Sequence, residues 1–171
     1  MAKKGRGETS LSDGEVRVVA ARSSRLLEPT LGNLDSLVVD SIVCGLCVDV
    51  RPLGGVLGMI DWRLCGRLSE FLKNDVIKGD DGEQVLMPSQ GRLTAPRIFL
   101  YGWGVSTAAS ARAAERVAAM VAMVDKAGAE RVAFAFPEPA RGLVDAGTRL
   151  VEEALGDRLV ALFTADPLPP Q

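Results

Sequence analysis

The sequence contains no histidine, and this absence excludes several kinds of catalytic site. Serine-type triads, most catalytic zinc sites and most general-base mechanisms near neutral pH use an imidazole ring. Enzymes that rely on carboxylates or lysine alone stay compatible with the composition. The missing imidazole therefore counts against an enzyme and favours a binding or interaction module without a cofactor.

Long apolar runs and a strong excess of one charge are also missing. No run approaches the ~20 apolar residues that a membrane-spanning helix requires, and the N-terminus lacks the apolar stretch of a signal peptide. The net charge is only −2, whereas dedicated nucleic-acid binders usually carry a concentrated basic face. We therefore expect a cytoplasmic protein that binds neither membranes nor nucleic acid.

Cysteine is scarce and odd in number, since the chain has only Cys44, Cys47 and Cys65. An odd count in a small domain is not a disulfide framework. Cys44 and Cys47 form a C-x-x-C motif, but redox motifs of this kind normally lie at a helix N-terminus. Here the pair lies at the end of an apolar strand, and no second pair of cysteines completes a zinc site. We expect reduced, structural thiols and no metal.

What the sequence does contain is typical of one globular domain: 171 residues, of which 47% are hydrophobic and 25% charged. We expect a polar tail over residues 1–14, a domain over residues 15–166 and a proline-rich tail over residues 167–171. The predicted strands are residues 16–21, 37–46, 84–87, 97–101, 131–136 and 159–163, and the predicted helices are residues 56–74, 106–127 and 143–155. Because strands and helices alternate in the second half, we expect an α/β three-layer sandwich with a mixed, mainly parallel sheet.

The turn between the strand at residues 97–101 and the next helix is the candidate ligand-binding site. Gly102, Trp103 and Gly104 leave the strand, and Ser106 or Thr107 is a good N-cap for the helix. Backbone N–H groups at such a turn can bind a phosphate. However, the turn lacks the third glycine of a dinucleotide fingerprint and the lysine of a P-loop. Trp103 either stacks on a base or fills the space, and we favour filling.

Other polar residues have simpler interpretations. Asp40 interrupts an apolar strand, so its carboxylate must find partners or lie near the strand end. Trp62 is expected to pack on the sheet, while Asp61 and Arg63 serve the helix end or solvent. The acidic turn at residues 80–83 offers too few oxygens for a calcium site. A hydrolase that uses Asp40 or Asp61 is therefore the weakest of our functional hypotheses.

Four segments together are similar to the N-terminal domain of bacterial leucyl aminopeptidases. They are residues 51–55, 61–69, 82–88 and 97–104. The family has a strand entry of the type G-x-G-E-x-x-L-x-P followed by a strand of the type R-x-x-L-x-G-x-G. Gly79 and Gly82-Glu83 approximate the first pattern, and Arg97 through Gly104 match the second. The resemblance covers roughly residues 16–165.

This resemblance implies a macro-domain-like fold and a role in assembly. In the full-length peptidases the domain assists hexamer formation, and the metals and catalytic residues lie in a separate C-terminal domain. The sequence ends at Gln171 and contains no N-T-D-A-E-G-R signature, so no catalytic residue carries over.

Two functions from different classes stay open at this point. The leading hypothesis is a non-catalytic interaction module that associates with itself or with another protein. The rival is a nucleotide or ADP-ribose binding module, as in true macro domains, in which Gly102, Gly104 and Ser106 hold a phosphate.

Overall fold

The computed structural model describes residues 25–109, 111–138 and 144–163. In this part of the chain, six strands form one sheet in the order β1-β6-β5-β2-β4-β3. Strand β3 pairs antiparallel with β4, and every other pairing is parallel. The strands are β1 (Leu26–Leu27), β2 (Ser41–Cys47), β3 (Gln84–Pro88), β4 (Arg97–Gly104), β5 (Val132–Ala135) and β6 (Leu159–Phe163).

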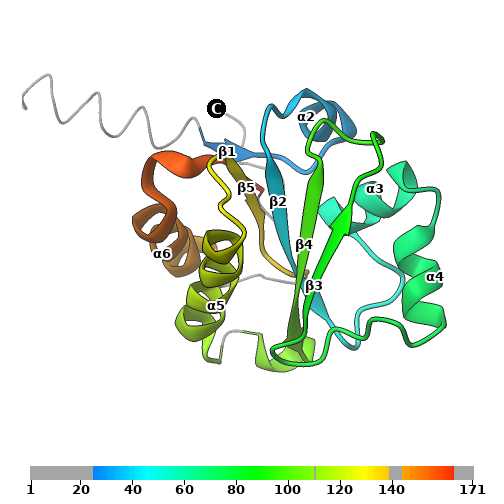
Figure 1. The fold of residues 1–171 in the computed structure, drawn as a ribbon. Helices are drawn as coiled ribbons and strands as arrows, with labels where there is room; N and C mark the ends of the chain where they lie inside the picture. The colour runs from blue at the N-terminus through cyan, green and yellow to red at the C-terminus, as the bar shows by residue number, and fades with distance from the viewer. Residues whose placement is uncertain (1–24, 110, 139–143, 164–171) are drawn as a thin grey trace, which may run out of the picture.

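Helices cover both faces of this sheet (Figure 1). Helices α5 and α6 lie on one face, and α3 and α4 lie on the other. The helices are α2 (Leu31–Ser36), α3 (Gly55–Arg63), α4 (Arg67–Lys73), α5 (Ala113–Lys126) and α6 (Val144–Leu155), with short 3-10 helices η1 (Ser106–Ala108) and η2 (Gly156–Arg158). The predicted α/β sandwich with a mixed, mainly parallel sheet is therefore confirmed.

The pleat of the central strands divides the core into two layers. On β2, Val43 and Cys47 face the layer under α5 and α6, whereas Ile42 and Cys44 face the layer under α3. All seven residues of β2 are buried. A strand covered on both faces reads as a nearly continuous apolar run, which is the pattern that predicted this strand.

The strand predictions differ from the structure mainly at their ends. The predicted strand at residues 37–46 begins only at Ser41, and the one at residues 97–101 continues to Gly104. The other three described strands agree to within one residue at each end. Strand β1 and helix α2 were not predicted. The predicted strand at residues 16–21 and both tails, residues 1–14 and 167–171, lie outside the described residues.

The prediction of one helix over residues 56–74 is wrong, because the helix is interrupted after Arg63. Cys65 and Gly66 have positive φ values of 57° and 81°, which end α3. The Asp61 carboxylate then accepts hydrogen bonds from the N–H groups of Leu68 (2.7 Å) and Ser69 (3.1 Å) at the start of α4. Asp61 therefore serves a helix end, as predicted, but it caps the second helix and not its own.

Within the described ranges, no helix is both long and apolar enough to span a membrane.

Candidate functional site

The turn begins later than the sequence predicts, because Gly102, Trp103 and Gly104 are the last three residues of β4 and only Val105 separates them from Ser106. A phosphate bound here would need free backbone N–H groups. The N–H of Gly102 donates to the Glu83 carbonyl (2.7 Å), and the N–H of Gly104 donates to the Gly79 carbonyl (3.0 Å). The chain therefore already uses the donors that a phosphate would need, because the segment of residues 79–83 packs against the turn. Ligand binding by Gly102, Trp103, Gly104 and Ser106 stays a prediction.

Trp103 is fully buried in the layer under α5. Its indole N–H donates to the carbonyl of Ala109 (2.9 Å). Its ring makes edge contacts with Tyr101 and Phe136, at centroid distances of 6.3 and 6.5 Å. Trp103 therefore fills space inside the protein, and its faces are not open for stacking on a base.

Ser106 is held by a carboxylate instead of capping a long helix. Both its N–H and its hydroxyl donate to Asp49, each at 2.8 Å. These two hydrogen bonds lower the pKa of Asp49. The predicted helix at residues 106–127 is wrong at its start, because η1 ends at Ala108 and α5 begins only at Ala113. An aspartate thus lies where an anionic ligand of this turn would bind.

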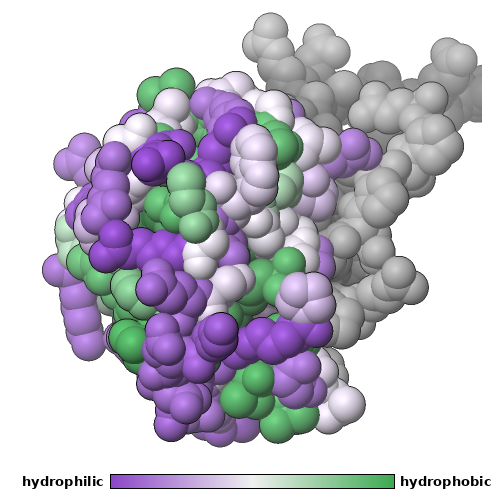
Figure 2. Space-filling view, turned by 90° about the vertical axis from the view of Figure 1, so that its right-hand side faces the viewer, coloured by the Kyte–Doolittle hydropathy of each residue, from purple (hydrophilic) through white to green (hydrophobic). Residues whose placement is uncertain are grey.

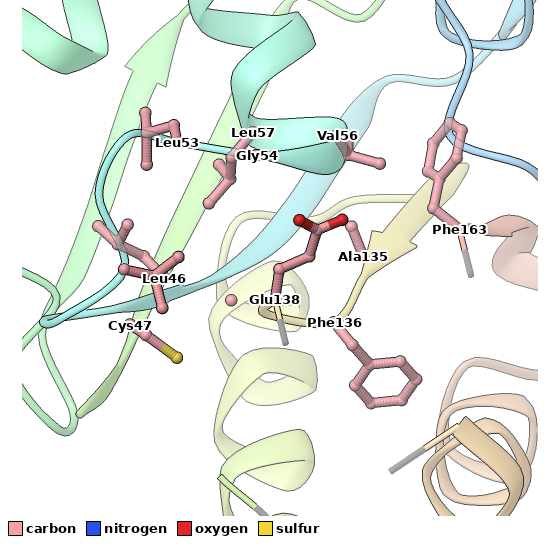
Figure 3. A pocket seen from close by; sticks show the side chains of 12 residues that line it. Leu46, Cys47, Leu53, Gly54, Val56, Leu57, Ala135, Phe136, Glu138 and Phe163 are labelled. Carbon is pink, nitrogen blue, oxygen red and sulfur yellow. The ribbon is translucent and has the colours of Figure 1, made fainter. Parts of the chain in front are cut away.

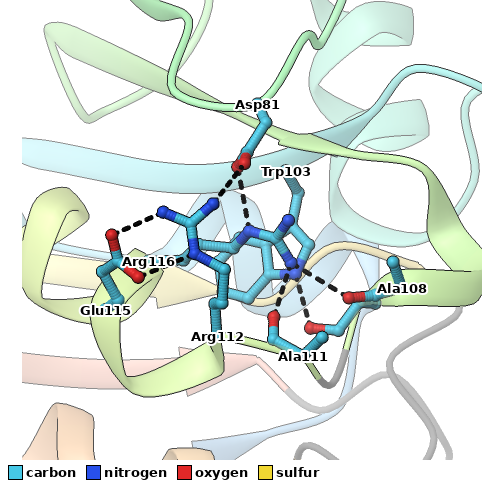
Figure 4. Close-up of polar contacts among 8 residues, drawn as sticks. Asp81, Trp103, Ala108, Ala111, Arg112, Glu115 and Arg116 are labelled. Carbon is cyan, nitrogen blue, oxygen red and sulfur yellow. Dashed lines mark hydrogen bonds and ion pairs between the residues drawn. The ribbon is translucent and has the colours of Figure 1, made fainter.

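A buried arginine, Arg116, fastens the same region from α5 (Figure 4). Its side chain is 7% exposed and donates to Asp81 at 2.9 Å. It also donates to the carbonyls of Ala108 (3.1 Å) and Ala111 (2.8 Å), and it lies 5.7 Å from the centre of the Trp103 ring. One guanidinium therefore ties together the acidic turn, η1 and the buried tryptophan.

The second partner of Asp81 is Arg112, which also pairs with Glu115 (Figure 4). The hydrogen bond from Arg116 lowers the pKa of Asp81, and the charge of Arg112 adds to the effect. The sequence pattern excluded a calcium site at the acidic turn but did not predict this cluster. A signal was present, because Arg116 precedes Met120 by four residues and so shares the buried stripe of α5.

A small pocket lies at the carboxyl ends of β2, β5 and β6 (Figure 3). It encloses about 20 Å³, which is room for about one water molecule. Figure 3 shows Glu138 extending from the end of β5 toward Gly54. A Cβ atom placed on Gly55 would lie only 2.0 Å from a Glu138 carboxylate oxygen. Glycine at positions 54 and 55 therefore lets this carboxylate approach the N-terminal end of α3.

Asp40 and the two cysteines of the C-x-x-C motif have structural surroundings. The Asp40 carboxylate accepts hydrogen bonds from Arg97 (2.9 Å) and from the N–H groups of Glu130 and Arg131. Asp40 therefore has hydrogen-bond partners, and it also lies at a strand end because it directly precedes β2. Burial raises the pKa of Cys44 to about 12 and, together with the charge of Asp49, that of Cys47 to about 11.

Trp62 does not pack on the sheet, and that prediction is wrong. Its side chain is 62% exposed. The guanidinium of Arg63 lies 4.7 Å from its ring centre, and Arg63 pairs with Asp35. Ile60 carries the buried face of α3, and a residue two positions later points to the opposite side of a helix.

Among the residues that the structure describes, no group of three or more metal-ligating side chains lies close enough to hold a metal ion.

Comparison with known proteins assigns the chain to a family. The model of the N-terminal domain of the cytosol aminopeptidase family matches residues 50–156, more than half of the chain. The chain belongs to this family. The match begins shortly after β2 and runs through α6, which includes every segment on which the resemblance rested, and it confirms that resemblance.

Curated relatives of this cytosol aminopeptidase N-terminal domain match over a short stretch. A probable cytosol aminopeptidase of Alkaliphilus metalliredigens (strain QYMF) is 32% identical over 75 residues, which are 44% of this chain and 15% of the relative. The chain therefore spans only a small part of the peptidases that it resembles, and the matching part of the family is its N-terminal domain.

Solved structures show the fold. A mutant of tomato leucine aminopeptidase superposes with a TM-score of 0.58 at 15% identity, covering 84% of this chain and 32% of that one. The macro domain of ganglioside induced differentiation associated protein 2 superposes with a TM-score of 0.56 at 16% identity, covering 83% and 76%. The domain thus has a macro-domain-like fold.

Proposed function

We propose that this chain is a non-catalytic assembly module that associates with a second copy of itself or with another protein, in the cytosol. The observation that carries the proposal is the outer edge of β3. This strand ends the sheet, so in the described part of the chain its outer N–H and C=O groups have no strand partner. An open strand edge is a template for pairing with another chain.

The side chains on β3 support the same proposal. Leu86 faces away from the layer under α3 and α4 and is 55% exposed. Its neighbour Met87 points inward and is buried. An exposed leucine on an open edge is a feature that monomeric proteins usually avoid with lysine or a covering loop. Contact with another chain would bury it.

The nucleotide alternative has less support. Open α/β folds bind ligands at the carboxyl ends of their strands. Three groups of this chain occupy that region: the buried Trp103, the Asp49 carboxylate on Ser106, and the Glu138 carboxylate near Gly54. The pocket there encloses about 20 Å³, whereas ligand pockets usually measure ~300–1,000 Å³. Nucleotide binding would require these groups to move.

Light scattering tests the assembly proposal directly. We expect a dimer or larger assembly across about 10–500 μM protein, and we expect Leu86→Lys to shift it toward monomer by adding a charge on the open edge. Val38→Lys is the matched control, because Val38 is 70% exposed but lies before β2, away from β3. A monomer at every concentration, together with no crosslinked protein partner, would refute the proposal. Equal effects of the two substitutions would refute the role of β3.

A further inference from the structure

A second surface lies where α3 turns into α4, beside the loop that follows β3. A groove of about 870 Å³ is lined there by Trp62, Arg63, Cys65 and Arg92, with Gly66 and Gly91 beside them. Both glycines face open space, since a Cβ atom on either would meet nothing within 4 Å. The groove therefore has an exposed aromatic ring on an otherwise uncrowded surface.

The arginines around this groove are only partly neutralised. Arg63 pairs with Asp35. In contrast, Arg92 contacts the Cys65 sulfur at 3.2 Å, and Arg67 donates to Gln90 at 3.3 Å. Within the described residues, neither Arg67 nor Arg92 has a carboxylate partner. Asp61, which also lines the groove, is occupied with the N-terminus of α4. What the groove and its border offer a partner is therefore the guanidinium groups of Arg92 and the neighbouring Arg67.

We propose that the Trp62 groove binds an acidic peptide segment of a partner protein. Tryptophan and arginine are the residues most enriched among those that dominate protein interfaces. Uncompensated guanidinium groups match carboxylates in geometry and charge. The proposal rests on the proposed function only in placing a protein partner on this domain, because the two surfaces are different.

Charge decides between the possible occupants of the groove. A nucleic acid is disfavoured because the whole chain carries a net charge of −2, and tight binding to phosphates requires many cationic contacts. A purely apolar partner is disfavoured because the face with α3 and α4 is mostly hydrophilic, with hydrophobic residues in separate spots (Figure 2). A second copy has less to offer, since the acidic turn already uses Asp81 and Glu83 internally.

The test uses a random twelve-residue peptide library displayed on phage and selected against the immobilised full chain. We expect the enriched peptides to be net negative. For a synthesised enriched peptide, Trp62→Ala and Arg92→Glu should each weaken binding about tenfold or more. Lys126→Glu is the matched control, because it makes the same charge change on an exposed residue of α5, across the sheet, and should change the affinity less than about twofold. Raising the salt from about 20 to about 300 mM should weaken the binding.

Several outcomes would overturn the proposal. They are no enrichment, enrichment of neutral or basic peptides, and equal affinity in the groove variants and the control. Tighter binding of a twelve-nucleotide oligothymidine that depends on Trp62, or self-association lost in Trp62→Ala, would assign the groove to another occupant. Arg92→Gln replaces Arg92→Glu if circular dichroism shows that the latter unfolds. Leu86-dependent assembly that persists while peptide binding fails would reject this groove and leave the assembly function standing.

Discussion

The two tryptophans offer a matched pair for testing how the carboxyl end of β4 is packed. Trp103→Phe removes the indole N–H from the Ala109 carbonyl, which lies in a buried residue. An unsatisfied buried acceptor costs about 1–3 kcal/mol. The smaller ring also leaves a cavity; because truncation of tryptophan to alanine costs ~3–5 kcal/mol, loss of one ring should cost about 1–2 kcal/mol. We therefore expect a total loss of about 2–5 kcal/mol.

Urea unfolding followed by far-ultraviolet circular dichroism measures this loss without using tryptophan as the probe. In a separate thermal unfolding experiment, the same loss should lower the Tm of a chain of this size by about 4–20 °C, at ~2–4 °C per kcal/mol. Trp62→Phe is the control and should stay within about 0.5 kcal/mol of the wild type, because its side chain is 62% exposed. A Trp103→Phe variant as stable as the wild type would refute the buried, hydrogen-bonded position of Trp103. Equal losses in both variants would refute the contrast between the two residues.

Four other measurements test separate parts of the argument. A thiol reagent at pH 8 should label one cysteine quickly, the exposed Cys65, because pKa values of about 12 and 11 keep Cys44 and Cys47 protonated; rapid labelling of two or three would contradict their burial. Calorimetry with ADP-ribose and ATP should show no binding tighter than about millimolar, and micromolar affinity that Gly104→Leu abolishes in a folded protein would reverse our preference. Leucine-based aminopeptidase substrates should stay uncleaved with zinc or manganese, and turnover that a point mutation in this chain removes would contradict a non-catalytic role. Asp49 and Asp81 have lowered pKa values, so their stabilisation is present above the unfolded value of ~3.9 and is lost as the pH falls through the lower folded values; a urea midpoint at pH 3 equal to that at pH 7 would count against both contacts.

The layers and most strands could be predicted from sequence because apolar periodicity reports burial directly. The β2 run is apolar at nearly every position since both of its faces are covered. The end of β4 was placed too early, because Gly102 and Gly104 are typical of a turn although the strand continues through them. The sequence also carried the correct family, through the pattern from Arg97 to Gly104.

One error came from a contact between residues far apart in the chain, and another from a local break in a helix. Nothing local shows that Asp49 binds Ser106, 57 positions later, so a serine that is a good N-cap was expected to begin the helix. The break at Cys65 and Gly66 is instead a local feature, where Asp61 accepts a hydrogen bond from the N–H of Leu68 at the start of the next helix. A helix pattern that continues on both sides of such a break has the same periodicity as one long helix.

The cysteine motif shows how strand geometry overrides a motif. Cys44 and Cys47 are three residues apart on β2, and their side chains enter opposite core layers. A strand rises ~3.3 Å per residue, so their Cα atoms are separated by roughly 10 Å. A disulfide requires about 4.4–6.8 Å between Cα atoms. The C-x-x-C spacing therefore cannot form an intramolecular disulfide while β2 is intact.

The carboxyl ends of the strands, where a ligand would bind, also depend on contacts from other segments of the chain. Glycines next to a helix N-terminus are compatible with a bound anion. Their local pattern is the same whether that anion is an external ligand or a carboxylate of the same chain. In this protein, carboxylates from other segments lie there: Asp49 on Ser106 and Glu138 near Gly54. A carboxylate tied to the chain has a high effective concentration at its site. A nucleotide would have to displace it in addition to binding, which is why the open edge of β3 and the Trp62 groove are the surfaces on which we place partners.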